Sequence, residues 1–540
     1  MLRRLGFYNQ SEVDKILEQP FDRIPLEHLL LEEDLLQECK SHNPRLIDYL
    51  SQPHIISQLL DYAVGIDEER MRRYAFIASE IFACEIWDIV DTVCNDLSTL
   101  FAPFWSFIEA PAPLNPLYAE HFSKVVGVLL QRRTTDVIAF IRSRPNLVQD
   151  HLLHHINTSA AMDLLLKIIS LEELPEGAGT VEWLNDQGLM EALLSGLDPN
   201  KDPEDHAAAA QVILDIITIS QCSNPELPSI GTNALITELK SARLVSQLVD
   251  YMLDPKAPHA TSSLVNGVAI FIELIRRNYV EMDEDMLASG IATGNGLSGF
   301  PQQVDLTDLI TVLSNRLVDF QHLLLHPRLH PEPVDTTVGK QVPLGFERLR
   351  VCELFAELLH LSSMALLNMT LAEEDGHGNK EGAKAKGVEE ENKALTPGDA
   401  LKAQLIHAAI LPTCLDLFFS FPWNNFLHTV VYDMVHQVLN IPLETPCNLR
   451  LIQSLFRDGH LSHRITQAQR QCDYEAEQPR GVRLGYMGHL TFIADQVVRL
   501  FERSKEDLGL EEYVEDPEWK AYVEGTLRET REKDRITLGG

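Results

Sequence analysis

Apolar residues recur at helical spacing along nearly every long segment of the chain. The segment 264–275 shows the pattern at i, i+4, i+7, i+8 and i+11, with Leu264, Val268, Phe271, Ile272 and Ile275. Segments 427–438 and 490–501 repeat it. Stripes of this width face a core rather than a narrow coiled-coil seam. Because no segment alternates apolar and polar residues between turn dipeptides, as strands do, we predict an all-α fold.

Residues that begin and end helices support this prediction. Asn43 precedes Pro44 as an N-cap, Pro53 opens a second helix and Gly65 closes it, so residues 43–65 are expected to form a helical hairpin. Many short helices over 540 residues are typical of an armadillo/HEAT-like helical-repeat solenoid. No clean sequence period is visible, so the repeats are expected to be irregular. A looser multi-helical bundle is the alternative.

Two segments interrupt the helical pattern. Residues 281–305 are rich in glycine and residues 372–399 are rich in charge, so both are expected to be exposed loops or disordered. In the charged tail, Trp519 and Tyr522 are the residues that could dock one more helix. We therefore divide the chain into an N-terminal array at 1–371, a charged flexible linker at 372–400, a C-terminal helical block at 401–503 and the tail at 504–540.

Charge and cysteine content narrow the class of protein. With 80 acidic and 45 basic residues, the net charge of −35 disfavours nucleic acid and anionic membrane as partners. The most apolar run, 262–278, contains Asn266 and Glu273, so membrane insertion is not expected. The eight cysteines are scattered without metal-binding or redox spacing and read as buried side chains in a reducing compartment. No apolar segment of a secretory signal follows the N-terminus, so we expect the chain in the cytoplasm and also in the nucleus.

Two short motifs resemble ligand sites without the context that such sites need. Gly294, Gly296 and Gly299 in "GNGLSG" match a dinucleotide fingerprint, but an acidic loop replaces the strand that should precede them. Asp375 and His377 in "EDGHG" resemble ligands of metallophosphatases, which need further ligands on other loops. We therefore expect no cofactor and no metal.

The stretch "HLLHHINTSAAMDLLL" places His151, His154 and His155 on one face if it is a helix. A zinc-protease helix would carry Glu after the first histidine, where this chain has Leu152, and a structural zinc would need two more ligands. We favour a joint between two helices, in which 157–159 provide the turn and N-cap of a helix at 160–169. Contact of His154 and His155 with a partner remains the alternative.

Two proline-containing junctions are further candidates for partner contact. In "PAPLNPLYAEHF", Asn115 and Pro116 read first as an N-cap and first helical residue. In "FFSFPWNNFLHTVVYDMV", Trp423 reads first as a wedge between helices, with Asn424 or Asn425 as the N-cap. The candidate contact residues are therefore His154, His155, Asn115, Pro116, Pro422, Trp423, Asn424 and Asn425, and no catalytic residue is predicted.

Six longer segments carry a resemblance to a known family. They include "SEVDKILEQPFDRIPLEHLLLEEDLLQECKSHNPRLIDYL", "LNPLYAEHFSKVVGVLLQRRTTDVIAFI", "LLHHINTSAAMDLLLKII", "SSLVNGVAIFIELIRRN", "PLGFERLRVCELFAELLH" and "FPWNNFLHTVVYDMVHQVLN". In this order, from about residue 10 to 500, they resemble the SAPS domain of the Sit4-associated proteins, the regulatory subunits of protein phosphatase 6, and are most similar to fungal members.

The resemblance implies a non-catalytic helical-repeat scaffold. Such a scaffold binds the catalytic subunit of a type-2A-like Ser/Thr phosphatase of the phosphatase 6/Sit4 type and directs it to substrates, in cell-cycle and signalling control. Ankyrin-repeat subunits are further partners that the resemblance implies. The catalytic metals would then belong to the partner.

Two other functions remain as alternatives to a phosphatase subunit. A generic armadillo-like adaptor or transport scaffold would keep the helical array and bind basic segments instead. A hydrolase would use one of the histidine clusters.

Overall fold

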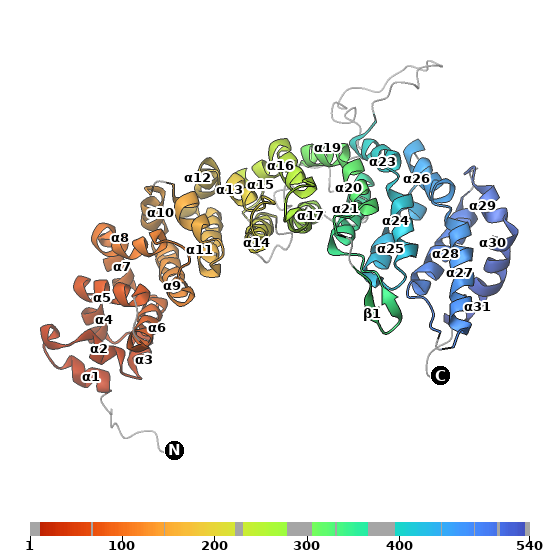
Figure 1. Cartoon of the computed structure of the whole chain (residues 1–540). Coiled ribbons are helices and arrows are strands. Elements are labelled where there is room, and N and C mark those ends of the chain that lie inside the picture. Colours follow the sequence, from red (N-terminus) through yellow and green to blue (C-terminus); the bar gives the residue numbers. More distant parts are fainter. Residues whose placement is uncertain are drawn as a thin grey trace, which may run out of the picture. The chain divides into compact units, whose positions relative to one another are not determined.

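The computed structural model describes residues 11–65, 69–144, 146–221, 230–277, 305–329, 332–364, 395–443, 445–479, 481–504 and 508–534. These residues form two compact units, one extending to Leu239 and the other beginning at Lys240 (Figure 1). Apart from one short hairpin, the regular elements of the described residues are helices. The prediction of an all-α fold is therefore confirmed.

The first unit consists of short and medium helices. Their bounds are α1 Glu12–Leu17, α2 Leu26–Leu30, α3 Leu35–Lys40, α4 Pro44–Leu50, α5 Pro53–Val64, α6 Glu69–Ala83, α7 Trp87–Asn95, α8 Ala102–Trp105, α9 Pro116–Arg132, α10 Thr134–Arg142, α11 Ser159–Ser170, α12 Thr180–Asp186, α13 Leu189–Ser195, α14 Pro203–Ser220 and α15 Ala234–Leu239. The predicted hairpin at 43–65 is confirmed as α4 and α5, and the side chain of Asn43 caps α4 by accepting a hydrogen bond from the backbone of Leu46.

A row of longer helices runs through this unit. α6, α9, α11 and α14 pack against one another in that order. Between α6 and α9, Nζ of Lys124 lies 2.8 Å from Oε1 of Glu80, and an imidazole–hydroxyl contact of 3.0 Å joins His121 to Ser79. Each helix buries its apolar stripe against its neighbours in the row, as expected of a helical repeat.

The second unit contains the remaining helices and the hairpin. Their bounds are α16 Ala242–Leu253, α17 Ala260–Arg277, α19 Thr307–Asn315, α20 Leu317–Leu325, β1 Val334–Thr336, β2 Gly339–Gln341, α21 Phe346–Ser362, α23 Pro397–His407, α24 Ile410–Ser420, α25 Asn425–Asn440, α26 Pro446–Arg457, α27 Leu461–Glu477, α28 Met487–Arg503, α29 Glu511–Glu515, α30 Pro517–Tyr522 and α31 Arg528–Asp534.

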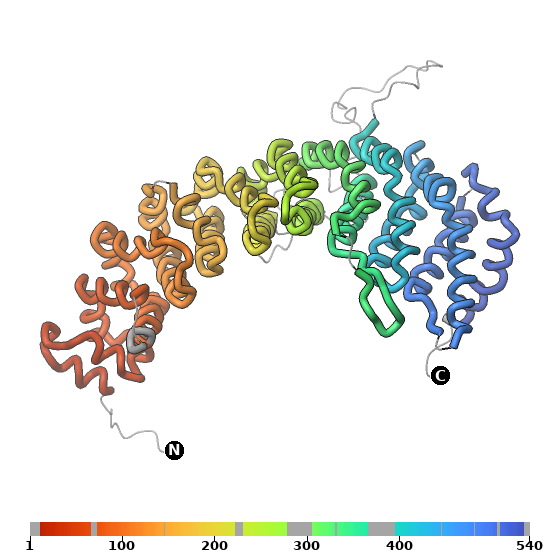
Figure 2. The backbone as a smooth tube through the Cα atoms, in the orientation of Figure 1, coloured from red at the N-terminus to blue at the C-terminus, as the bar shows by residue number. Residues whose placement is uncertain are grey.

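Three successive groups of three helices build most of this unit: α19–α21, α23–α25 and α26–α28. Corresponding helices stack on one another, with α19, α23 and α26 in one row and α21, α25 and α28 in another, which α17 extends (Figure 2). Three-helix groups stacked in this way are the armadillo-like arrangement predicted from the sequence.

The helices of the row α17, α21, α25 and α28 run parallel. Thr261 and Glu347 join the beginnings of α17 and α21, with 3.3 Å between Oγ1 and Oε1, whereas Arg276 and Glu357 join the two helices much nearer their C-terminal ends. Thr429 and His489 likewise connect the first turns of α25 and α28. The parallel order follows because each group of three helices returns to the same side before the next begins.

Insertions explain why no sequence period is visible. Twenty residues separate α20 from α21, and thirty-four separate α21 from α23, whereas four residues connect α24 to α25. The first helices of the groups therefore begin at Thr307, Pro397 and Pro446, with unequal spacing. Structural repeats are regular here while the sequence that forms them is not.

The hairpin β1–β2 was not expected from the sequence. Val334 pairs with Gln341 and Thr336 with Gly339 in an antiparallel register, and Gly339 has a φ of 98°, which favours glycine. The strands have three residues each and are almost wholly exposed, so they lack the apolar alternation that marks a half-buried strand. In Figure 1 the hairpin projects beyond the neighbouring helices.

The tail folds onto the helical block. Trp519 and Tyr522 of α30 are buried, and α30 packs against α27, which is the docking that these two aromatic residues predict. The predicted linker at 372–400 and the glycine-rich segment at 281–305 lie mostly outside the described residues, although α23 begins at Pro397. The division of the chain at 371, 400 and 503 therefore stays a prediction.

Across the described part of the chain, each helix taken singly is too short or too polar to cross a membrane. The bent pair α23 and α24, with 52° between its helices, reaches the required length and composition only when both are counted together.

Candidate functional site

The histidine stretch does not form the helix face that its spacing would allow. Residues Leu147–Leu152 form a π-helix and Leu153–His155 form a 3-10 helix, so His151, His154 and His155 do not follow one α-helical repeat. Within the described ranges, no group of three or more His, Cys, Asp or Glu side chains is arranged to hold a metal ion. The backbone changes its winding within the cluster and then enters α11 at Ser159–Ser170, so the predicted joint before a helix at 160–169 is confirmed.

His155 lies in the interior of the first unit. Its Nε2 is 3.0 Å from the carbonyl oxygen of Ile108 and donates to it, since a carbonyl can only accept. Burial lowers the pKa of His155, although the Ile108 carbonyl opposes this change. The residue is a neutral part of the core at neutral pH, and its side chain is not available on the surface.

His154 and Asn115 bring two of the predicted segments together. Nε2 of exposed His154 accepts a hydrogen bond of 3.2 Å from the backbone N–H of Ala112, three residues before Asn115. Oδ1 of Asn115 accepts from the backbone N–H of Leu117 at 3.0 Å, and Pro116 is the first residue of α9, so both structural roles predicted for this junction are confirmed. Whether these exposed residues contact a partner stays a prediction.

The junction at Pro422 lies in the second unit. Oδ1 of Asn424 accepts a hydrogen bond of 3.0 Å from the backbone N–H of Leu427, which identifies Asn424 as the N-cap of α25 and Asn425 as its first residue. Trp423 is half-buried against the loop that precedes α28, where the chain passes Gly485. Pro422 and Trp423 also line a cavity of about 470 Å³ next to the β1–β2 hairpin.

An aromatic surface follows this junction along α25 and α28. We call Phe426, Tyr432, His489 and Phe492 the aromatic face. The side chains of Phe426 and Phe492 are 77% and 58% exposed. The ring of Tyr432 lies 6.0 Å from His489 and 6.2 Å from Phe492, so these three form one continuous surface.

Buried groups beneath the aromatic face hold it in place. His428 is fully buried, its Nε2 donates to the carbonyl of Phe421 at 2.9 Å, and burial lowers its pKa to about 4. Its ring lies 4.9 Å from Phe418 and 5.7 Å from Tyr486, which connects α24 and α25 to the start of α28. The exposed aromatic residues of α25 and α28 therefore lie above a well-packed, uncharged core.

The sequence contained a signal for this face in two aromatic residues that lie just outside the apolar stripes of their helices. Phe426 and Phe492 both lie one position outside the stripes of α25 and α28, next to buried Leu427 and Ile493. A large aromatic residue outside the apolar stripe of a helix is placed in solvent unless something covers it. Neither residue was among the candidates selected from the sequence.

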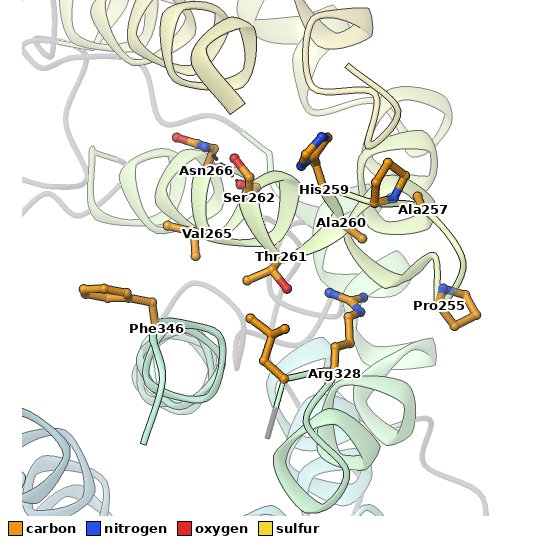
Figure 3. Close-up of a pocket in the computed structure, with 12 residues that line it drawn as sticks. Pro255, Ala257, His259, Ala260, Thr261, Ser262, Val265, Asn266, Arg328 and Phe346 are labelled. Atoms are coloured by element: carbon orange, nitrogen blue, oxygen red, sulfur yellow. Dashed lines mark hydrogen bonds between the residues drawn. The ribbon is translucent and has the colours of Figure 1, made fainter. Parts of the chain in front are cut away.

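A second cavity of about 470 Å³ lies between the starts of α17 and α21 (Figure 3). Phe346, which is 75% exposed, lines it from α21, and Val265 and Thr261 line it from α17. Arg328 contributes to its wall, while its guanidinium pairs with Glu347 at 2.7 Å and donates to the carbonyl of Met252. Since its charge is already neutralised by Glu347, Arg328 serves the structure of this cavity more than the binding of an anion.

Fold and surface together define a helical-repeat protein with exposed aromatic residues along two helices of its second unit. Comparison with known proteins gives the family. The chain belongs to the SAPS family, the SIT4 phosphatase-associated proteins, whose family model matches residues 126–536.

Named relatives extend the similarity to almost the whole chain. The extragenic suppressor of kinetochore protein 1 of Schizosaccharomyces pombe is 35% identical over 99% of this chain and 77% of its own length. The SIT4-associating protein SAP190 of Saccharomyces cerevisiae is 31% identical over 88% of this chain, and the serine/threonine-protein phosphatase 6 regulatory subunit 1 of Mus musculus is 30% identical over 100%. The chain spans 54% and 61% of the lengths of these last two relatives.

Among solved structures, the crystal structure of SYS-1 aligns with 97% of this chain and 93% of its own. Its TM-score is 0.23 and its sequence identity is 12%.

Proposed function

We propose that this chain is a non-catalytic regulatory subunit that binds the catalytic subunit of a SIT4/phosphatase 6-type serine/threonine phosphatase and directs it to substrates. The observation that carries the proposal is the family match over 126–536. A relative named as a regulatory subunit of phosphatase 6, aligned over 100% of this chain, supports it. In such a complex the catalytic subunit supplies the chemistry and this chain supplies surface.

We place the phosphatase contact on the aromatic face. Exposed aromatic side chains on a rigid support are typical anchors of protein interfaces, because they bury a large area at a small cost in side-chain entropy. Phe426 and Phe492 stand on helices of the parallel row, and each is next to a fully buried residue of its own helix. The face also lies within the residues that the family model matches.

The proposal includes the cellular role and a further partner. Control of the cell cycle is supported by the name of the Schizosaccharomyces pombe relative, an extragenic suppressor of kinetochore protein 1. An ankyrin-repeat protein as a third subunit rests on the sequence resemblance alone. Recruitment of such a protein is tested by the same capture experiment as the phosphatase.

Binding of the catalytic subunit is the decisive experiment. The purified chain is mixed with a purified phosphatase 6-type catalytic subunit and analysed by size-exclusion chromatography with light scattering. We expect a 1:1 complex that keeps its phosphatase activity. If the two proteins elute separately, and affinity capture from cells recovers cargo with basic segments instead of a phosphatase, the armadillo-like adaptor is the better description and the proposed function is wrong.

A further inference from the structure

The cavity beside the β1–β2 hairpin combines aromatic rings with a carboxylate. It lies in the second unit, between the hairpin, the end of α24, the end of α27 and the loop before α28. Its volume of about 470 Å³ is within the range of about 300–1,000 Å³ that is typical of ligand pockets. Three aromatic residues, two amides and one acid contribute to its lining: Phe419, Trp423, Tyr486, Gln471, Gln478 and Glu475. Among the described residues that line the cavity, Glu475 carries the single charge.

The aromatic rings of the cavity are held by their neighbours and remain partly open to solvent. The ring centres of Phe419 and Tyr486 lie 5.7 Å apart, with an angle of 76° between the ring planes. Trp423 packs against the backbone at Gly485, where an added Cβ would lie 3.2 Å from Cε3 of the indole. Phe419 and Trp423 are half-buried. Because the face of an aromatic ring is electron-rich, such rings attract cations.

The carboxylate of Glu475 gives the cavity a negative charge. Its Oε1 accepts a hydrogen bond of 2.9 Å from the neutral amide of Gln471, and it forms no ion pair with another described residue. Burial is the main reason that the pKa of Tyr486 is raised to about 12, and the sulfur of Cys472 and the carboxylate of Glu475 add to this shift. The Tyr486 hydroxyl is therefore neutral at neutral pH, and the charge beside it is that of Glu475.

The wall of this cavity already shows how the chain holds an arginine. The guanidinium carbon of Arg464 lies 4.5 Å from the centre of the Phe419 ring, and Nη1 of Arg464 lies 2.7 Å from Oδ1 of Asp416. A planar guanidinium can stack on an aromatic face while its N–H groups bind a carboxylate. Inside the cavity, the described residues offer a ring and a carboxylate in the same combination, but no cation of their own.

From this arrangement we propose that the cavity binds an arginine side chain in an extended segment of a partner protein. The guanidinium stacks on Trp423 and pairs with Glu475, and the residues on either side of the arginine lie against Val482 and Leu484, which also line the cavity. Arginine is favoured over lysine because its planar group can stack and pair at the same time. The net charge of −35 favours the approach of a basic segment.

This site is distinct from the proposed phosphatase contact. The four residues of the aromatic face do not line the cavity. The proposal therefore goes beyond the function proposed above and does not depend on it.

The test uses the intact purified chain without any phosphatase. The probe is a synthetic peptide with one arginine between two leucines and with glycine–serine ends. The five tryptophans of the chain are replaced by fluorotryptophan, and Trp423→Phe assigns the fluorine NMR signal of Trp423. We expect this signal to shift and to reach saturation as the peptide is added. The same peptide with citrulline, which has nearly the shape of arginine without its charge, should bind about tenfold more weakly.

Two acidic residues of α27 provide a matched pair of variants. Glu475→Gln removes the charge of the cavity, while the new amide oxygen can still accept the hydrogen bond from Gln471. It should weaken binding of the arginine peptide about fivefold. Glu477→Gln is the control, because it changes the net charge equally, but Glu477 is exposed and does not line the cavity. It should leave the affinity unchanged.

Three results would each overturn the proposal. These are a Trp423 signal that does not respond to the arginine peptide, equal binding of the citrulline peptide, and equal effects of Glu475→Gln and Glu477→Gln. Each of them would leave the capture of a phosphatase unaffected, so this proposal and the proposed function can fail separately.

Discussion

Nη1 of Arg328 lies 2.7 Å from Oε1 of Glu347, and this ion pair connects the segment after α20 to the first turn of α21. Both side chains are largely buried, and the second Nη of Arg328 donates to the carbonyl of Met252 at the end of α16. Three elements that are far apart in the sequence therefore meet at one charged pair. Such a pair holds a unique arrangement only while both partners are present.

Removal of Glu347 should destabilise the second unit strongly. Glu347→Ala leaves the Arg328 guanidinium buried without a counter-ion, and we expect the free energy of unfolding to fall by about 3 kcal/mol, measured by urea denaturation. The double variant Arg328→Met/Glu347→Leu should recover most of this loss, because it removes both charges together. As a control, Glu12→Ala breaks the exposed pair with Lys15 and should change stability by no more than about 0.5 kcal/mol. Equal effects of Glu347→Ala and Glu12→Ala would contradict this view of the pair.

His428 should make the second unit sensitive to acid. Its pKa in the folded chain is about 4, below the value of about 6.5 for a free histidine, so the unfolded chain binds a proton more readily. Stability is therefore complete above about pH 6.5 and falls as the pH decreases from there toward 4. The urea midpoint of the wild-type chain should decline over this window.

The variant His428→Gln tests the assignment of this effect. Its amide can still donate to the Phe421 carbonyl, which His428 contacts at 2.9 Å, but it does not titrate. The variant should lose less stability between pH 7.5 and 5 than the wild type does. Parallel pH profiles for the two proteins would show that His428 is not responsible.

The aromatic face should contribute to phosphatase binding and not to folding. Phe426→Ala/Phe492→Ala removes two side chains that are mostly in solvent, so the thermal midpoint should stay within a few degrees of the wild type. We expect the affinity for the catalytic subunit, measured by calorimetry, to fall at least tenfold, as for anchor residues of an interface.

Trp87→Ala is the matched control, because Trp87 is also an exposed aromatic residue on a helix but belongs to the first unit. This variant should bind normally. An unchanged affinity of the double variant, or an equal loss with Trp87→Ala, would place the interface elsewhere.

The sequence predicted the helices well because helical periodicity reports directly on which side of a segment is buried. Leu427, Val431 and Met434 of α25 were expected to face the core, and all three do. The N-caps of α4 and α25 could also be predicted, since Asn43 and Asn424 act on backbone groups only a few residues away. A single sequence therefore predicts best those features that depend on contacts between residues close together in the chain.

Features set by distant contacts were harder to predict. The change from π to 3-10 winding at 147–155 accompanies a hydrogen bond from His155 to Ile108, which is 47 residues away. Tyr432 and Phe492 come together only because α25 and α28 pack against each other, and no local pattern records that packing. The contact residues chosen from the sequence were therefore residues of helix junctions, whereas the broad exposed surface lies along the helices that follow them.

The parallel row of α17, α21, α25 and α28 has an electrical consequence. Each helix carries a dipole with its partial positive charge at the N-terminus, and four dipoles aligned side by side add instead of cancelling. The edge of the row that contains Thr261, Phe346 and Asn425 is therefore the positive pole of the stack, and the opposite edge is the negative pole. In a chain of net charge −35, these backbone dipoles therefore make one edge of the row less negative than the other. A charged molecule that approaches the row would be attracted to one edge and repelled from the other.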